Sequence, residues 1–138
     1  MKRFIIVCIF TIFALPSFAQ KDLHPIDKFL EDCMEKDMST AGMVKCINEA
    51  YDKWDSELNR IYKLLMKNLG EKYSAPLKSA QLEWIAFRDK EFLLIDEIYS
   101  RLEGTMYIPM RASDRMEIVK KRVFELEAYM ELLNINDK

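Results

Sequence analysis

Apolar side chains recur every three or four residues through most of the chain, which is the spacing of one face of an α-helix. The clearest stretch begins near residue 43, and its apolar positions follow in steps of 4, 3, 4, 4, 3, 4 and 4. Ser39 or Thr40 is expected to cap this helix and Gly70 to stop it, which predicts a helix of about 30 residues, or roughly 45 Å. Its stripe consists of Met43, Ile47, Ala50, Trp54, Leu58, Ile61, Leu65 and Leu69.

A second long helix is expected between Ser74 and Gly104, because proline is tolerated in a first helical turn and Pro76 lies there. A short first helix is expected over residues 25–35, where the apolar residues Ile26, Phe29 and Leu30 share a face. The stripe of the helix at 74–104 consists of Leu77, Ala80, Trp84, Phe87, Leu94, Ile98 and Leu102.

The last stretch, after Pro109, predicts a third long helix. Its apolar positions follow in steps of 3, 4, 3, 4 and 3, which is the spacing of a coiled-coil seam. Long helices joined by short turns favour antiparallel packing, and no segment alternates apolar and polar residues as a strand would. The seam consists of Met116, Val119, Val123, Leu126, Met130 and Leu133.

The N-terminus has the pattern of a secretory signal peptide. Lys2 and Arg3 precede an uncharged apolar run over residues 4–15, and small residues lead up to Ala19. The run is shorter than the about 20 residues that cross a bilayer. We therefore predict a signal peptide over 1–19, a single helical domain over 20–138, a periplasmic or secreted location, and no stable membrane insertion after cleavage.

Removal of residues 1–19 changes the charge and the cysteine count. The remaining chain holds 23 acidic and 19 basic residues, a formal net charge of −4. This balance disfavours nucleic acid and is compatible with a cationic protein partner. Cys33 and Cys46 remain, and an even pair in an oxidising compartment predicts a disulfide. The predicted fold is therefore all-α: an antiparallel bundle of three long helices plus a short N-terminal helix, with one disulfide.

Two motifs follow one another on the predicted helices. Residues 46–62 read C-x3-A-x3-W-D-x2-L-N-x2-Y, and residues 77–89 read L-K-x-A-Q-x2-W-x2-F-R-D. Together they resemble the lysozyme-inhibitor LprI-like family of small secreted helical domains, over about residues 33–126. The resemblance implies a secreted or periplasmic protein, and lysozyme inhibition for at least some relatives.

In proteins similar to this one, a cysteine commonly follows the F-R-D motif and another lies near the start of the last helix. Phe92 and Asp114 stand at those places here. The resemblance therefore implies that Cys33 and Cys46 form the retained bridge, and that the last helix lacks a second one.

The polar residues of the motifs are the first candidate site: Trp54, Asp55, Asn59, Gln81, Trp84, Arg88 and Asp89. One interpretation is a binding or catalytic cluster. The other is a network of hydrogen bonds and ion pairs between helices, because buried polar groups need partners. In the second interpretation Arg88 is expected to pair across helices with Asp55 or a nearby carboxylate.

The loop before the last helix is the candidate partner-binding site. It places Met106, Tyr107 and Ile108 between helices, where a solvated turn would favour polar residues. Anchored aromatic residues are typical of interface hot spots. The alternative is that these three residues cap the open end of the bundle.

We expect neither catalysis nor a cofactor or metal. His24, the one histidine, precedes Pro25 in a segment expected to be mobile, and no second histidine is available for a proton relay. Met34 and Met38 are soft ligands near Cys33, yet oxidation of that cysteine would remove it as a ligand.

The leading hypothesis is a binding protein of the cell envelope, with lysozyme inhibition as its candidate activity. The alternative is a structural or adaptor helical domain that binds another envelope protein without inhibiting lysozyme.

Overall fold

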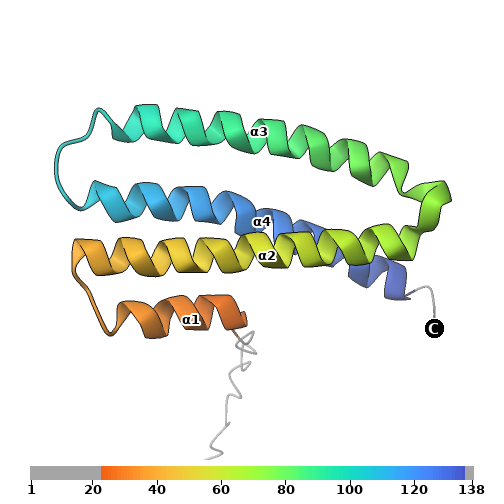
Figure 1. The fold of residues 1–138 in the computed structure, drawn as a ribbon, viewed down its shortest axis with the longest axis horizontal. Coiled ribbons are helices and arrows are strands. Elements are labelled where there is room, and N and C mark those ends of the chain that lie inside the picture. The colour runs from red at the N-terminus through yellow and green to blue at the C-terminus, as the bar shows by residue number, and fades with distance from the viewer. Residues whose placement is uncertain (1–22, 136–138) are drawn as a thin grey trace, which may run out of the picture.

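The computed structural model describes residues 23–135, and the predicted signal peptide at 1–19 lies outside them. Four helices follow in order: α1 (Pro25–Met34), α2 (Thr40–Tyr73), α3 (Ala75–Tyr99) and α4 (Tyr107–Ile135). Figure 1 shows α1 and α3 running opposite to α2 and α4. Residues 23–135 contain no strand, and the predicted all-α antiparallel bundle is confirmed. No helix in this part of the chain combines the length and the apolar character needed to cross a membrane.

The core lies between α2 and α4, whose stripes were predicted correctly. Trp54 of α2 and Val119 of α4 are fully buried, with exposed fractions of 0%. Burial of such side chains is worth about 1.5–3 kcal/mol each, which makes this pair of stripes the main stabilising contact. The buried apolar cluster consists of Ile47, Ala50, Trp54, Leu58, Ile61, Leu65, Met116, Val119, Val123 and Leu126.

The helix boundaries follow local signals with three exceptions, one of which is that α4 begins at Tyr107, before Pro109. The Ser39 side chain accepts a hydrogen bond from the Gly42 N–H at 3.0 Å, so Ser39 is the N-cap of α2. Gly70 has a left-handed φ of +67° and kinks α2, but the helix resumes and ends at Tyr73. The predicted end of α3 at Gly104 is wrong, because α3 ends at Tyr99 and Gly104, with φ +119°, lies in the following loop.

Two contacts between distant residues fix α1 to the bundle. The predicted Cys33–Cys46 disulfide is present and joins α1 to α2. The Lys120 ammonium of α4 lies 2.6 Å from the Asp27 carboxylate of α1, and each side chain is 20% exposed. The first helix is therefore held covalently at one end and by a half-buried ion pair near the other.

The predicted inner stripe of α3 is largely wrong. Phe87, Leu94 and Ile98 are each about half exposed, and Ala80 and Leu102 are also exposed. The helix instead turns the side that carries the buried Gln81 toward its neighbours, and Leu77, Trp84 and Phe92 pack against the core. Apolar residues occupy more than one side of α3, so their spacing could not identify the inner face.

A hydrogen bond and a ring contact join α3 to α4 near the positions where the family resemblance placed a second cysteine pair. The Tyr99 hydroxyl donates a hydrogen bond to Asp114 Oδ2 at 2.6 Å, and this bond raises the pKa of Tyr99. The Arg115 guanidinium lies over the Phe92 ring, 4.5 Å from its centroid. Noncovalent contacts therefore tie the start of the last helix to α3.

Candidate functional site

The Gln81 side chain of the second motif is buried and holds an arginine of the last helix. Arg122, 9% exposed, donates a hydrogen bond from Nε to Gln81 Oε1 at 3.1 Å. Its guanidinium also lies over the Trp84 ring, 5.8 Å from the centroid. Two side chains of the A-Q-x2-W segment therefore contact a cation that comes from another helix. Sequence reasoning missed Arg122, because its position beside the seam residue Val123 resembles that of any solvent-facing base.

The other polar motif residues make local contacts. The Asn59 amide donates to the Asp55 backbone oxygen at 2.8 Å and to its carboxylate at 3.2 Å, and Asn59 is exposed. The predicted pairing of Arg88 with Asp55 is wrong: Arg88 donates to the adjacent Asp89, at 2.7 Å from Nη2. Adjacent residues on a helix point in different directions, so this pair does not link helices.

His24 lies in an ordered position, contrary to the expectation of a mobile segment. Its Nδ1 accepts a hydrogen bond from the Ile26 N–H at 3.2 Å, which caps the start of α1. Its ring centroid lies 4.4 Å from that of Trp54 and 6.0 Å from that of Phe124. The histidine thus contributes to the packing of α1 on the core.

His24 is also part of the one group of ligand-type side chains found within residues 23–135. Ligand atoms of His24, Glu57 and Glu127 lie within 4.8 Å of one another, and these residues could hold a divalent cation. However, Nδ1 of His24 already accepts a hydrogen bond, so the neutral ring carries its hydrogen on Nε2. Coordination of a metal through Nε2 would move this hydrogen to Nδ1 and break the bond that caps α1. The hydrogen bonds that the Arg60 guanidinium donates to Glu57 lower the pKa of that carboxyl group.

Of the three candidate residues, the structure places Met106 in the loop before α4, and Tyr107 and Ile108 in the first turn of α4. Met106 is 61% exposed and Ile108 is 46% exposed. Tyr107 is half-buried at the first residue of α4, with its ring centroid 6.4 Å from that of Tyr99. Figure 1 shows this loop at the same end of the bundle as the turn between α1 and α2. Tyr107 therefore has the position of a cap, whereas Met106 and Ile108 face solvent.

Ile108 lies between two grooves of opposite character. The acidic groove, of about 680 Å³, is lined by Ile108 and by residues of α2 that include two acids, Glu49 and Asp52, and one base, Lys45. The basic groove, of about 340 Å³, is lined by Ile108 with residues that include Arg111 and Arg115. The sequence did not single out these charged residues, because solvent-facing charges recur along every helix of the chain.

Comparisons with known proteins agree with this architecture. A sequence model described as "Lysozyme inhibitor LprI" matches residues 31–126. A crystal structure of an uncharacterised protein from Burkholderia thailandensis is similar, with a TM-score of 0.76 and 28% sequence identity. The alignment covers 83% of this chain and 57% of that one, so the chain spans little more than half of that protein's length. No curated protein matches the chain significantly.

Proposed function

The chain belongs to the LprI lysozyme-inhibitor family, and from this we propose that it is a secreted or periplasmic binding protein that inhibits a lysozyme. The match over residues 31–126 is the observation that carries the proposal, because it includes both motifs and most of the helical bundle. Residues 1–19 would act as the signal peptide that exports residues 20–138. The proposed role is that of an inhibitor and not of an enzyme.

The loop end of the bundle, defined as residues 104–109 with the acidic groove beside them, supplies the best-suited surface. Ile108 offers an exposed apolar anchor, and Glu49 and Asp52 supply acidic groups in the same groove. Apolar anchors inside a charged rim are typical of protein interfaces. Lysozymes are cationic, so acidic groups beside the anchor would favour association and orient the enzyme.

The net charge of the exported chain supports the same partner. Its 23 acidic and 19 basic residues would attract a cationic enzyme over distances comparable to the Debye length, about 8–10 Å at moderate salt. An inhibitor that relies on this attraction should bind more weakly as salt rises. Binding through an apolar face alone should respond much less.

A lysozyme activity assay with residues 20–138 tests the proposal. Inhibition should be stoichiometric and should weaken between low and moderate salt. The double variant Glu49→Lys/Asp52→Lys should weaken inhibition by roughly tenfold or more, mainly through slower association. The matched control is Glu71→Lys/Glu131→Lys, which reverses two exposed charges at the opposite end of the bundle. Absence of both inhibition and complex formation with lysozymes of several classes would refute the proposal.

A second candidate function is that of an adaptor that binds another envelope protein. The exposed apolar side chains of α3 favour it, because Phe87, Leu93 and Leu94 are 51%, 70% and 51% exposed. Exposed apolar patches of this kind mark interaction surfaces. Capture of an envelope protein that Leu93→Glu abolishes, with lysozyme unaffected throughout, would support this function instead.

A further inference from the structure

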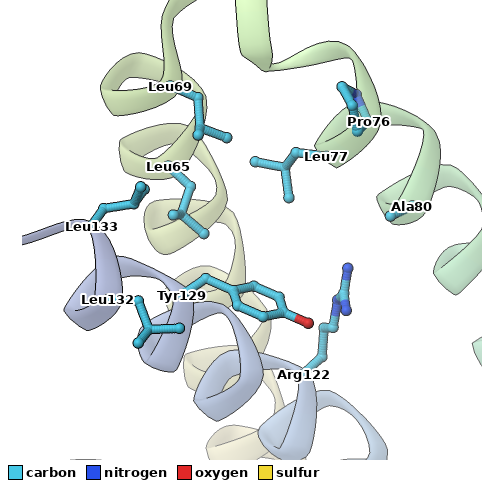
Figure 2. Close-up of a pocket in the computed structure, with 9 residues that line it drawn as sticks. All are labelled: Leu65, Leu69, Pro76, Leu77, Ala80, Arg122, Tyr129, Leu132 and Leu133. Atoms are coloured by element: carbon cyan, nitrogen blue, oxygen red, sulfur yellow. The ribbon is translucent and has the colours of Figure 1, made fainter.

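An apolar groove of about 460 Å³ lies at the end of the bundle opposite the loop end, between α2, α3 and α4. Its aliphatic walls include Leu65 and Leu69 of α2, Leu77 of α3, and Leu133 of α4. Figure 2 shows these side chains converging on a common space. The volume falls within the roughly 300–1,000 Å³ of sites that bind small molecules, which are mostly apolar with a few polar groups that fix orientation.

Two polar groups meet at one side of this groove. Figure 2 shows the Arg122 guanidinium and the Tyr129 hydroxyl beside each other, with Ala80 across from the guanidinium. Arg122 is the one charged residue in the lining. The groove therefore combines a long aliphatic surface with a positive charge at a defined place.

The hydrogen bonds of Arg122 leave part of its guanidinium available. Nε donates to Gln81 at 3.1 Å, and Nη1 donates to the Glu125 carboxylate at 2.9 Å. Nη2 donates no hydrogen bond to any of residues 23–135. The Glu125 side chain is 56% exposed and can turn toward solvent, whereas Arg122 is buried. A buried cation whose carboxylate partner is exposed to solvent favours a second anion.

We propose that this groove binds a single-chain amphiphile with a compact anionic head group, such as a fatty carboxylate. The head group would accept hydrogen bonds from Arg122 Nη2 and from the Tyr129 hydroxyl. The alkyl chain would lie along Leu65, Leu69 and Leu77, where each buried methylene adds to the affinity. Gln81 acts as a positioning residue, because its bond to Nε fixes the plane of the guanidinium. The site is at the opposite end from the proposed inhibitory surface and does not depend on it.

Titration of residues 20–138 with laurate below its micelle concentration tests the proposal. Binding is read by calorimetry and by tryptophan fluorescence, to which Trp84 contributes from beside Arg122. Laurate should bind one-to-one, and dodecyltrimethylammonium roughly tenfold or more weakly, because Arg122 repels its head group. A second titration with a lysophosphatidylglycerol distinguishes two kinds of natural ligand. Tighter binding of laurate indicates a free fatty acid, and tighter binding of the lysophospholipid indicates a phospholipid product. Absence of binding by both anions overturns the proposal.

Two variants locate the site without removing Arg122. Ala80→Phe adds a ring at an exposed position that faces the groove, so it should abolish laurate binding and leave the thermal unfolding temperature near that of the parent. Tyr129→Phe removes one hydroxyl and should weaken binding about three- to tenfold. Ala86→Phe, at an exposed alanine of α3 that does not line this groove, makes the same change in size and is the control. Unchanged laurate affinity in Ala80→Phe, or equal affinities for laurate and its cationic homologue, would overturn the assignment.

Discussion

Gln81 and Arg122 are 41 residues apart in the sequence, yet the Arg122 Nε donates a 3.1 Å hydrogen bond to the Gln81 side-chain oxygen inside the bundle. The contact joins α3 to α4 and gives the glutamine of the second motif a physical role. If this acceptor is lost, the buried guanidinium must either move or leave its Nε donor without a partner, although Nη1 keeps its bond to Glu125. Each alternative costs free energy, because the desolvation of Arg122 is no longer offset.

Gln81→Ala is therefore expected to lower the free energy of unfolding by about 1–3 kcal/mol, since the donor that it leaves is charged and buried. Urea denaturation followed by circular dichroism measures the change. Asn59→Ala is the control, because Asn59 is exposed and bonds only within its own helix turn. Equal effects of the two substitutions would contradict a special role for Gln81.

The Asp27–Lys120 ion pair should contribute measurably to stability. Both side chains are 20% exposed, and the pair joins α1 to α4. Asp27→Ala should cost about 1–3 kcal/mol, between the values for surface and for buried pairs, and Glu117 at 3.6 Å limits the loss. Arg101→Ala breaks a pair in which both side chains are more than 60% exposed, and should change stability by less than about 0.5 kcal/mol.

Arg88→Ala should have a small effect on stability. Its carboxylate partner is the adjacent and largely exposed Asp89, so no buried charge is left behind by the substitution. A loss of about 1 kcal/mol or less is expected, from the ion pair and from the contacts of the guanidinium with the Trp84 and Phe92 rings. Thermal unfolding measures it. A loss of 3–5 kcal/mol would instead indicate the buried cross-helix pair that the sequence suggested.

Reduction of the Cys33–Cys46 bond should lower stability by about 3 kcal/mol in the loop-entropy model, because only a short segment is enclosed. The change should be measured by urea denaturation of a Cys33→Ser/Cys46→Ser variant. The effect should fall mainly on α1, which would then be held by its ion pair with Lys120 and by the packing of Ile26, Phe29 and Leu30 on the core. Thiol labelling of the unfolded, unreduced protein should find no free cysteine in residues 20–138, and two labelled thiols would contradict the bond.

The outcome for the individual helices shows what the sequence could determine. In α2 and α4 a regular spacing of three and four residues identified the side chains that pack with Trp54 and Val119, although α4 also carries exposed apolar residues. α3 has apolar residues on several sides, and only the burial of Gln81 reveals its inner face. A polar residue on an inner face does not fit the rule that inner positions are apolar. Its partner Arg122 lies on another helix, so only the packed structure shows that the two residues meet.

The candidate site could be predicted from the sequence only in part, for the same reason. Met106, Tyr107 and Ile108 stood out because three large apolar residues interrupt a turn. Which of them cap and which face solvent depends on where α4 begins, and Pro109 suggested a later start than Tyr107. The grooves beside Ile108 arise from residues of α2 and α4 that are distant in sequence, so no local pattern marked them.

The final prediction distinguishes partner binding by Ile108 from capping of the bundle by Tyr107. Ile108→Ala should lower affinity for lysozyme and leave stability nearly unchanged, because the side chain is 46% exposed and lines both grooves. If Ile108 is an interface anchor worth about 2 kcal/mol, the affinity should fall about thirtyfold. Tyr107→Ala should do the reverse. It removes a half-buried ring that packs near Tyr99 at the start of α4, so thermal unfolding should begin earlier while affinity changes little.

Both variants are measured by lysozyme binding and by circular dichroism on the same preparations. If Ile108→Ala binds as tightly as the parent, the loop is not the recognition surface, and the acidic residues of α2 would have to act without an apolar anchor. If Tyr107→Ala instead loses affinity at unchanged stability, the anchor is the tyrosine, and its ring must leave Tyr99 when the partner binds.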